Sequence, residues 1–99
     1  MVESALLARS YVHGMTEDEF DSSQLVRDAV AYRVGIIGEA ARDVSAATAE
    51  MISLDWRGMR GMRNKLFHGY RDVDFENLWE TATTDLDAVI SEIEAFLNR

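Results

Sequence analysis

The sequence predicts an all-α protein that folds as an up-down bundle of four to five helices. Apolar residues recur every three or four positions along almost the whole chain of 99 residues, and this spacing is that of one face of an α-helix. No stretch of strand length alternates apolar and polar residues, and proline, the commonest helix breaker, is absent. Because short connections between long helices favour antiparallel neighbours, we expect the helices to run up and down.

The first two elements are expected near the N-terminus. Apolar side chains four residues apart predict a helix from Val2 to Gly14, where the glycine is a natural stop. Thr16, followed three residues later by Glu19, has the form of a capping box, in which each side chain binds the backbone N–H of the other residue. This pair predicts the start of a short helical turn.

The longest helix is expected to follow a cap at Asp21 or Ser22 and to continue through about Val44. Its inward stripe is expected to be Leu25, Ala29, Ile36, Ala40 and Val44, flanked by Val26, Val30, Ile37 and Ala41. The segment from Ser45 to Ile52 has a weaker helical pattern, which indicates a short or irregular helix.

Two further helices are expected in the C-terminal half. Asp55 is the predicted N-cap of a helix that ends at Gly69. Asp74 is the predicted N-cap of the last helix, with Val73 and Leu78 placed as a hydrophobic staple. The last helix presents the stripe Leu78, Ala82, Leu86, Val89, Ile93 and Phe96 or Leu97. Core or interface positions are expected for Trp56, Met59, Met62, Leu66, Phe67 and Trp79.

Length and composition indicate one domain, residues 1–99, which is small enough for a partner subunit to help stabilise it. Cysteine is absent, which excludes disulfides and thiolate metal sites, and the carboxylates are scattered. We therefore expect neither a metal nor another cofactor. No apolar run approaches the roughly 18 residues of a membrane span, and signal-peptide features are missing. The expected location is the cytoplasm, away from membranes.

The charge is unevenly distributed along the chain. The formal net charge of −8 argues against general affinity for nucleic acid. Between Trp56 and Arg71, however, every charged residue is basic: Arg57, Arg60, Arg63, Lys65 and Arg71. A positive segment on an acidic body attracts an anionic ligand locally while the body repels other polyanions. The alternative interpretation is a solvated basic helix that forms salt bridges with the acidic helices.

One segment, Gly61 to Tyr70, combines the residue types that metal-free cleavage of RNA requires. It contains a cation (Arg63), an amide (Asn64), an imidazole (His68) and a phenol (Tyr70). Attack of a 2′-hydroxyl on phosphorus needs a group that titrates near neutral pH to move protons, and histidine is the natural candidate. The reaction also needs a fixed cation beside the phosphorane, and the forked guanidinium of arginine matches phosphate geometry.

Helical geometry divides this segment. Asn64 and His68 are four residues apart and share a helix face, so the amide can orient the imidazole or bind a phosphate oxygen. Arg63 and His68 diverge by roughly 140° around a straight helix, which makes a shared site within one chain awkward. If two copies pair about a two-fold axis, each His68 can face Arg63 of both subunits, so we expect a homodimer with a composite site. Tyr70 would share the face of Arg63 only if the helix reached that far.

The ordered motifs resemble those of HepT proteins, a branch of the HEPN superfamily. Arg63-x4-His68-x-Tyr70 is similar to the R-x4-H-x-Y signature, and Asn64 matches the family's preference for a polar residue after the arginine. Three further stretches resemble family motifs in the same order: Ile37-Gly38-Glu39-Ala40-Ala41, Trp56 followed by Gly61-Met62-Arg63-Asn64, and Val73-Asp74 followed by Leu78-Trp79. The resemblance spans about residues 5–97 and departs at Arg60, where the family has isoleucine.

This resemblance implies a homodimeric HEPN bundle that acts as the toxin of a type II HepT–MntA toxin–antitoxin system. It implies metal-independent endoribonuclease activity on tRNA or mRNA, with His68 as general acid/base, Arg63 as transition-state stabiliser and Asn64 as orienting residue. The implied partner is an MntA-type nucleotidyltransferase antitoxin, which can attach AMP to the motif tyrosine, here Tyr70. The added anion would block RNA by charge and volume.

Other interpretations remain open for some residues and for the function. Glu39 is expected to pair with Arg63, either structurally or by orienting it for catalysis. Solvation is the first expectation and RNA contact the second for Arg60, Lys65 and Arg71. Tyr70 can instead be a half-buried aromatic, and His13 has no assigned role. The alternative function is a non-catalytic HEPN subunit that binds nucleotide or substrate for a nucleotidyltransferase, and the third is a purely structural helical dimer.

Overall fold

The computed structural model describes residues Met1–Arg99 and is entirely helical, which confirms the all-α prediction. The helices are α1 (Val2–Tyr11), α2 (Glu17–Asp21), α3 (Gln24–Arg42), α4 (Ala46–Met51), α5 (Trp56–His68), α6 (Phe75–Glu80) and α7 (Leu86–Leu97). A 3₁₀ turn covers Tyr70–Asp72, and a π-helical segment, Thr81–Asp85, joins α6 to α7 in one rod. The two short helices α2 and α4 lie in the connections between the longer ones, which is why the chain exceeds the predicted four to five helices.

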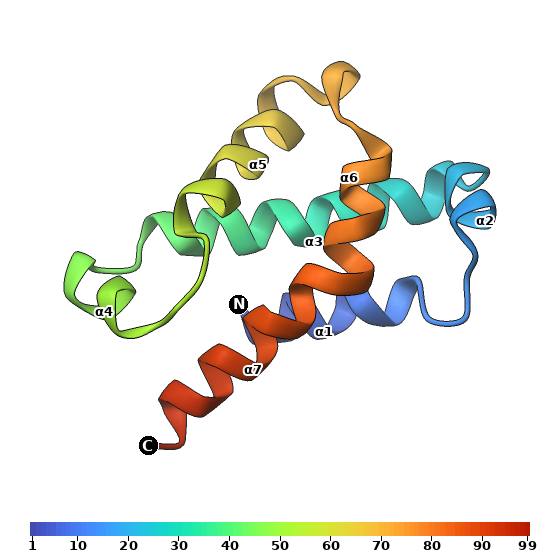
Figure 1. Ribbon diagram of the computed structural model, residues 1–99. Helices are drawn as coiled ribbons and strands as arrows, with labels where there is room; N and C mark the ends of the chain where they lie inside the picture. Colours follow the sequence, from blue (N-terminus) through green and yellow to red (C-terminus); the bar gives the residue numbers. More distant parts are fainter.

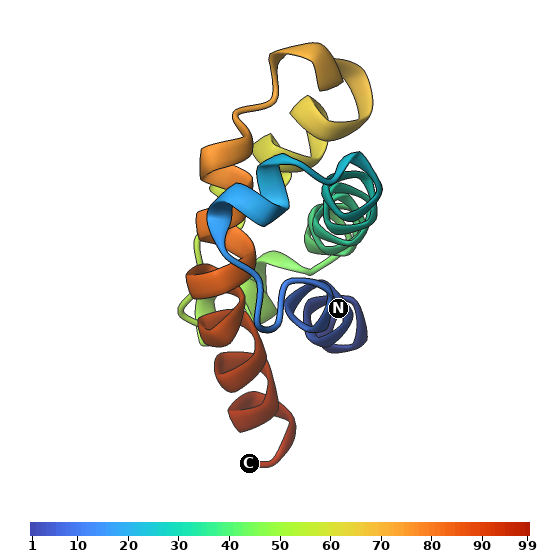
Figure 2. The ribbon, with the colours of Figure 1, turned by 90° about the vertical axis from the view of Figure 1, so that its right-hand side faces the viewer.

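Helix α3 crosses the middle of the molecule, with α1 packed against one side and α5 against another (Figure 1). Successive long helices run in opposite directions, as an up-down bundle requires (Figure 1). The rod formed by α6 and α7 lies across α1, and Figure 2 shows it as a separate layer beside α1 and α3, which are seen nearly end-on. None of the helices combines the length and apolar character that a membrane-spanning segment needs.

The predicted helix ends are largely confirmed. Both hydrogen bonds of the Thr16–Glu19 capping box form, at 3.0 and 3.1 Å. The carboxylates of Asp55 and Asp74 each accept backbone N–H bonds in the first turn of α5 and α6. The cap of α3 was predicted wrongly, since it is Ser23 rather than Asp21 or Ser22. Helix α2 continues through residue 21, so the chain is free to start a new helix only after that point.

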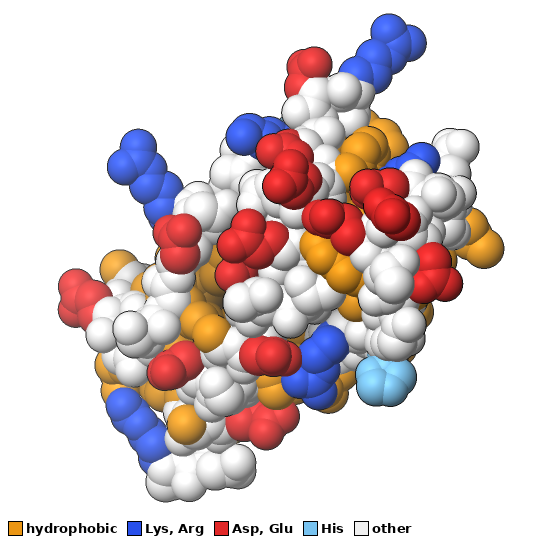
Figure 3. All heavy atoms as spheres, turned by 45° about the vertical axis from the view of Figure 1, so that its right-hand side comes forward, with side chains coloured by type: hydrophobic (Ala, Val, Ile, Leu, Met, Phe, Trp, Pro, Cys, Tyr) orange, Lys and Arg blue, Asp and Glu red, His pale blue; other side chains and the backbone are white.

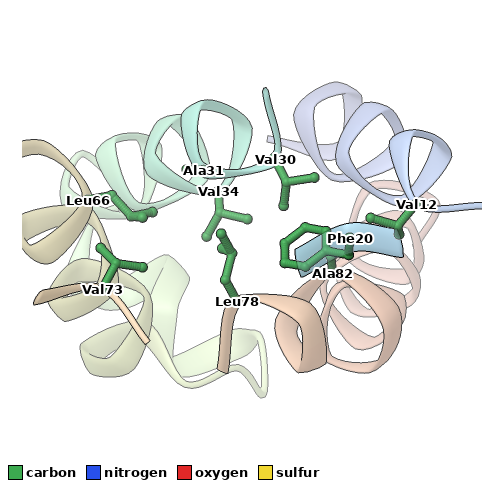
Figure 4. Packing of buried hydrophobic residues seen from close by; sticks show 9 residues of the cluster. All are labelled: Val12, Phe20, Val30, Ala31, Val34, Leu66, Val73, Leu78 and Ala82. Carbon is green, nitrogen blue, oxygen red and sulfur yellow. The ribbon is translucent and has the colours of Figure 1, made fainter. Parts of the chain in front are cut away.

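The core consists of two clusters. In the larger one, Leu78 of α6 extends toward Val34 of α3, with Phe20 of α2 beside it (Figure 4). Val73 and Leu78 both belong to this cluster, as expected for a hydrophobic staple. The second cluster joins α1, α3 and α7 through Ala5, Ala8, Ile37, Leu86, Val89 and Ile90. Of the stripe predicted for the last helix, Leu78, Ala82, Leu86 and Val89 are buried, whereas Ile93 and Phe96 are half-buried and Leu97 is exposed.

The inward face of α3 differs from the prediction. Leu25 exposes 81% of its surface, and the other members of the predicted stripe are only half-buried. The buried residues of α3 are Val30, Ala31, Val34, Gly35, Ile37, Gly38 and Ala41. Helix α3 is therefore apolar on two faces, and the helices of this chain cover only one of them. Periodicity identifies apolar faces but not which of two faces meets a neighbour.

Two glycines of α3 allow α5 to approach closely. A Cβ atom at Gly38 would lie 2.5 Å from the Cβ of Arg63 and 2.5 Å from the carbonyl oxygen of Met59. A Cβ at Gly35 would lie 2.5 Å from Cζ of Phe67. These distances are well inside van der Waals contact, so only residues without a side chain fit. The close approach brings Glu39, the residue after Gly38, against α5.

Replacing Gly38 with alanine is expected to lower the free energy of unfolding by about 1–3 kcal/mol, the usual cost of overpacking. Gly61→Ala is the matched control on α5, because a Cβ there meets nothing within 4 Å. The control is expected to be neutral or to gain up to about 1 kcal/mol from helix propensity. Urea unfolding followed by circular dichroism measures both, and equal stability of the two variants would contradict the close approach of α3 and α5.

Candidate active site

Arg63 is held in place by α3. Its Nε donates a 2.5 Å hydrogen bond to Oε2 of Glu39, and the other carboxylate oxygen, Oε1, lies 3.7 Å from Nη1 of Arg42. The side chain of Arg63 is only 16% exposed, whereas that of Glu39 is 43% exposed. A charge-assisted bond of this kind fixes the direction of a guanidinium that could otherwise adopt many rotamers. The predicted pairing of Glu39 with Arg63 is confirmed.

The outer end of the guanidinium meets the rest of the motif. Nη1 donates to Oδ1 of Asn64 at 3.1 Å and lies 3.3 Å from Nε2 of His68. The ring of Phe67 lies under the guanidinium, 5.4 Å from Cζ to the ring centroid. A guanidinium can only donate hydrogen bonds, so the contact with His68 requires a neutral imidazole with its proton on Nδ1 and its lone pair on Nε2. Asn64 thus orients the arginine, and no contact shows it orienting the imidazole.

The expectation that Arg63 and His68 would be awkward to bring together within one chain is wrong. The divergence of roughly 140° describes where the two side chains leave the helix, not where their tips lie. The arginine side chain is long, and His68 is the last residue of α5, so the two tips meet although their Cα atoms face different ways. The geometric reason for requiring a second subunit at the site is therefore removed, while the homodimer itself stays a prediction.

The N-terminal half of α5 is anchored by Trp56, whose Nε1 donates to the carbonyl oxygens of Ala49 and Ile52 at 3.1 Å each. The helix ends where predicted, since the N–H of Gly69 closes its last turn on Lys65. It therefore stops before Tyr70, which does not share the helix face of Arg63.

Tyr70 instead turns toward α3. It begins the 3₁₀ turn, and its hydroxyl donates a hydrogen bond to Oδ1 of Asp28. Its ring packs edge-on against Phe75, with the centroids 5.8 Å apart. Burial, together with the hydrogen bond to Asp28 and the charge of that carboxylate, raises the pKa of Tyr70 to about 12. Tyr70 forms no hydrogen bond with Arg63, Asn64 or His68, so it lies beside the cluster rather than in it.

The remaining cations of the basic segment face solvent. Arg57, Arg60, Lys65 and Arg71 are exposed and form no salt bridge with the acidic residues of the chain. The space-filling view in Figure 3 shows acidic side chains spread over the face turned to the viewer, with basic side chains standing apart from one another. Solvation, the first expectation for Arg60, Lys65 and Arg71, agrees with their exposure, and all three are free to contact an anion. No group of three or more His, Asp or Glu residues is placed to hold a metal ion.

Sequence reasoning missed two features of this region. Asp28 was not singled out, because nothing in the local sequence connects it with Tyr70, 42 residues away. Phe67 was assigned to the core or an interface, yet it is 40% exposed and lies under the guanidinium of Arg63. In the sequence, the only indication that Phe67 belongs to the site is its position between Arg63 and His68.

Comparison with known proteins agrees with the resemblance. The model of a family described as Ribonuclease HepT-like matches residues 1–96. A "Putative RNase" of Methanocaldococcus jannaschii is 30% identical over 95 residues, which are 95% of this chain and 87% of that protein. The "Probable ribonuclease HepT" of Thermococcus cleftensis is 27% identical over 95% of this chain and 86% of that protein. These matches confirm the family that the motifs indicated.

A further relative is longer. The "Gamma-glutamylcyclotransferase and putative RNase" of Methanocaldococcus jannaschii is 33% identical over 94 residues, which are 94% of this chain and 42% of that protein. The chain thus spans less than half the length of this relative. No solved structure matches the chain.

The phenol of Tyr70 is expected to ionise at a higher pH than an ordinary tyrosine. Because its pKa is raised from 10.0 to about 12 in the folded protein, the protonated phenol stabilises the fold below pH 10, and this contribution is lost as the pH rises toward 12. In a titration followed by phenolate absorbance, Tyr70→Phe should lose the transition near pH 12. In Asp28→Asn the pH of this transition should fall only part of the way toward 10, because the burial of Tyr70 remains. A transition near pH 12 that persists in Tyr70→Phe would refute the assignment.

Proposed function

The chain belongs to the HepT-like ribonuclease family, and from this premise we propose that it is the metal-independent endoribonuclease toxin of a HepT–MntA toxin–antitoxin pair. We propose tRNA or mRNA as its substrate. One observation carries the proposal: Arg63 Nη1 lies 3.3 Å from His68 Nε2 at the exposed end of α5. A fixed cation and a proton acceptor therefore lie side by side at the surface, where both can reach the same phosphodiester.

The geometry supports division of the chemistry between the two residues. Binding of the phosphodiester is proposed to replace the contact between Nη1 of Arg63 and Nε2 of His68, which frees the Nε2 lone pair to take the proton of the RNA 2′-hydroxyl as its oxygen attacks phosphorus. A bond forms between O2′ and phosphorus, the bond between phosphorus and O5′ breaks, and His68 returns the proton to the departing 5′ oxygen. Nη2 of Arg63 forms no hydrogen bond within the chain, so it is available to a phosphoryl oxygen while Glu39 holds Nε. The guanidinium then stabilises the charge that develops on the phosphorane.

The uncovered face of α3 supports a homodimer. We define the outer stripe as Leu25, Ala29, Ile36 and Ala40, of which Leu25 is 81% exposed and the others are half-buried. Its apolar residues keep a helical spacing and remain partly exposed in the single chain, and small alanines allow close packing. A two-fold axis across the stripe would pair it with itself, as isologous interfaces do. Because Ala40 follows Glu39, this pairing would place two copies of the active site at the edge of one interface.

Tyr70 supports the proposed control by an MntA-type nucleotidyltransferase antitoxin. Its ring is 38% exposed, and its hydroxyl lies beside the site rather than within it. In the proposed transfer, the phenolic oxygen bonds to the α-phosphorus of a nucleoside triphosphate and pyrophosphate leaves. Asp28 already accepts the hydroxyl's hydrogen bond and is placed to take its proton. The attached AMP would repel RNA by charge and occupy the space next to His68.

His68→Ala is expected to reduce RNA cleavage by about 10²–10⁴-fold, the usual contribution of a general acid/base, and to abolish growth arrest on expression. The fold should be retained, because His68 is exposed at the end of its helix. His13→Ala is the matched control, since that imidazole is also exposed. Initial rates on total RNA, with circular dichroism for folding, measure both variants. Undiminished cleavage by His68→Ala would refute the proposal, and tight nucleotide binding without cleavage by the unmodified chain would favour the non-catalytic alternative.

Leu25→Glu is expected to weaken self-association by tenfold or more, because it replaces the most exposed apolar residue of the proposed interface with a charge that would be buried on pairing. Leu97→Glu is the matched control, since Leu97 is also a largely exposed leucine, at 70%, but lies at the end of α7. Sedimentation equilibrium compares the dimer dissociation constants of both variants. If the two substitutions have the same effect, the interface does not include the outer stripe.

A further inference from the structure

A shallow groove lies next to the active site and has no role in the mechanism above. Its volume is about 260 Å³, and it is lined by Asp28, Ala31, Tyr32, Leu66, Phe67 and Tyr70. Phe67 connects the groove to the site, since it precedes His68 and lies under the guanidinium of Arg63. If Arg63 and His68 bind a phosphate of RNA, the base of the attached nucleotide can therefore reach this groove.

We propose that the groove is a base-specific subsite that holds a guanine adjacent to the cleaved phosphodiester. This inference rests on the proposed ribonuclease function and adds the base that the enzyme prefers. Three observations carry it: exposed aromatic rings in one groove, a carboxylate held at its wall, and a volume that suits one planar base.

The aromatic rings favour a stacked base. In the single chain Tyr32 is 54%, Phe67 40% and Tyr70 38% exposed. Tyr32 follows Ala29 by three residues and borders the outer stripe, so a base stacked on it would lie at the edge of the proposed dimer interface. Large aromatic side chains bury hydrophobic surface when they can, and three half-exposed rings in one groove form a surface that a flat ring can cover. Unpaired bases of single-stranded RNA bind proteins by stacking on such side chains. Arg33 lies 5.4 Å from the ring centroid of Tyr32 and adds a positive charge beside this surface.

The carboxylate of Asp28 selects among the bases. Its Oδ1 accepts a hydrogen bond from the hydroxyl of Tyr70, which fixes the carboxylate at the groove, and its Oδ2 forms no hydrogen bond or salt bridge within the chain. An ionised carboxylate can only accept hydrogen bonds. Guanine is the base whose Watson–Crick edge presents two adjacent donors, N1–H and N2–H. Adenine, cytosine and uracil each place an acceptor beside their donor, which a carboxylate repels.

The size of the groove agrees with a single base. Pockets for drug-sized ligands commonly measure about 300–1,000 Å³, and this groove, at about 260 Å³, is smaller. It is also mostly apolar in lining, with Asp28 as its one charged residue. A phosphate or a ribose would therefore be a poor occupant, and the phosphates are expected to remain outside the groove with the basic side chains.

Cleavage-site mapping tests the proposal. An RNA that contains every dinucleotide step is digested to low conversion by the unmodified chain, by Asp28→Asn and by Asp43→Asn. We expect cleavage next to guanine to exceed cleavage next to other bases by about tenfold or more, given the usual discrimination by paired hydrogen bonds. In Asp28→Asn the preference should move toward adenine, because an amide offers the acceptor and the donor that N6–H and N1 of adenine require. Asp43→Asn, an exposed aspartate at the end of α3, should keep the guanine preference.

A binding measurement separates this inference from the proposed function. His68→Ala is titrated with short 2′-deoxy oligonucleotides, which cannot be cleaved and which differ only in one central base. Tighter binding of the guanine oligonucleotide by about tenfold, lost in the double variant with Asp28→Asn, supports the subsite even if no cleavage is ever observed. Tyr32→Ala should weaken binding of all four oligonucleotides about equally, because stacking is tolerant of sequence.

Two results would overturn the subsite. One is equal cleavage rates and equal binding affinities for all four bases. The other is a preference that Asp28→Asn leaves unchanged. In either case normal cleavage by the unmodified chain would leave the ribonuclease proposal standing. Circular dichroism of each variant excludes loss of folding as the cause.

Discussion

The contact between α3 and α5 is the constraint on which the rest of this structure depends. Gly38 has no side chain to collide with the backbone of α5, so that backbone lies directly on α3, and Gly35 leaves room for the ring of Phe67. Glu39 then reaches Arg63 with a 2.5 Å hydrogen bond. The packing of α5 on α3 therefore determines both how the core is closed and the direction of the Arg63 guanidinium. A glycine in a helix interior costs stability in itself, and here the loss is offset by the close fit and by the placement of a charge.

The electrostatics follow from the same contact. Arg63 is largely covered and paired with Glu39, so it acts as a directed donor rather than as a free charge. In the proposed function, the exposed cations of α5 and the following turn would supply general attraction for phosphates, while the net charge of −8 would discourage binding elsewhere. An acidic protein would thus bind a polyanion at one place. Such binding is expected to weaken with salt, as phosphate contacts do.

The hydrogen bond between Tyr70 and Asp28 links two proposed roles. It fixes the carboxylate at the groove where a guanine would bind, and it holds the hydroxyl that an antitoxin would modify. AMP attached to Tyr70 would remove the donor of this bond and place an anion against Asp28. Modification would then disturb base recognition as well as block the phosphate position. This arrangement explains how a change outside the Arg63–His68 cluster could silence it.

The sequence by itself determined the helices, most of their caps and the segment in which the candidate site was sought. Caps such as Thr16–Glu19 and Asp55 involve residues only three apart, so local sequence contains all of the interaction. Tertiary structure decided the rest. Only packing selects which apolar face of α3 is covered, and only side-chain length and the end of α5 let Arg63 reach His68. Asp28 met Tyr70 because the helices brought together residues 42 positions apart, and no local pattern encodes a contact at that separation.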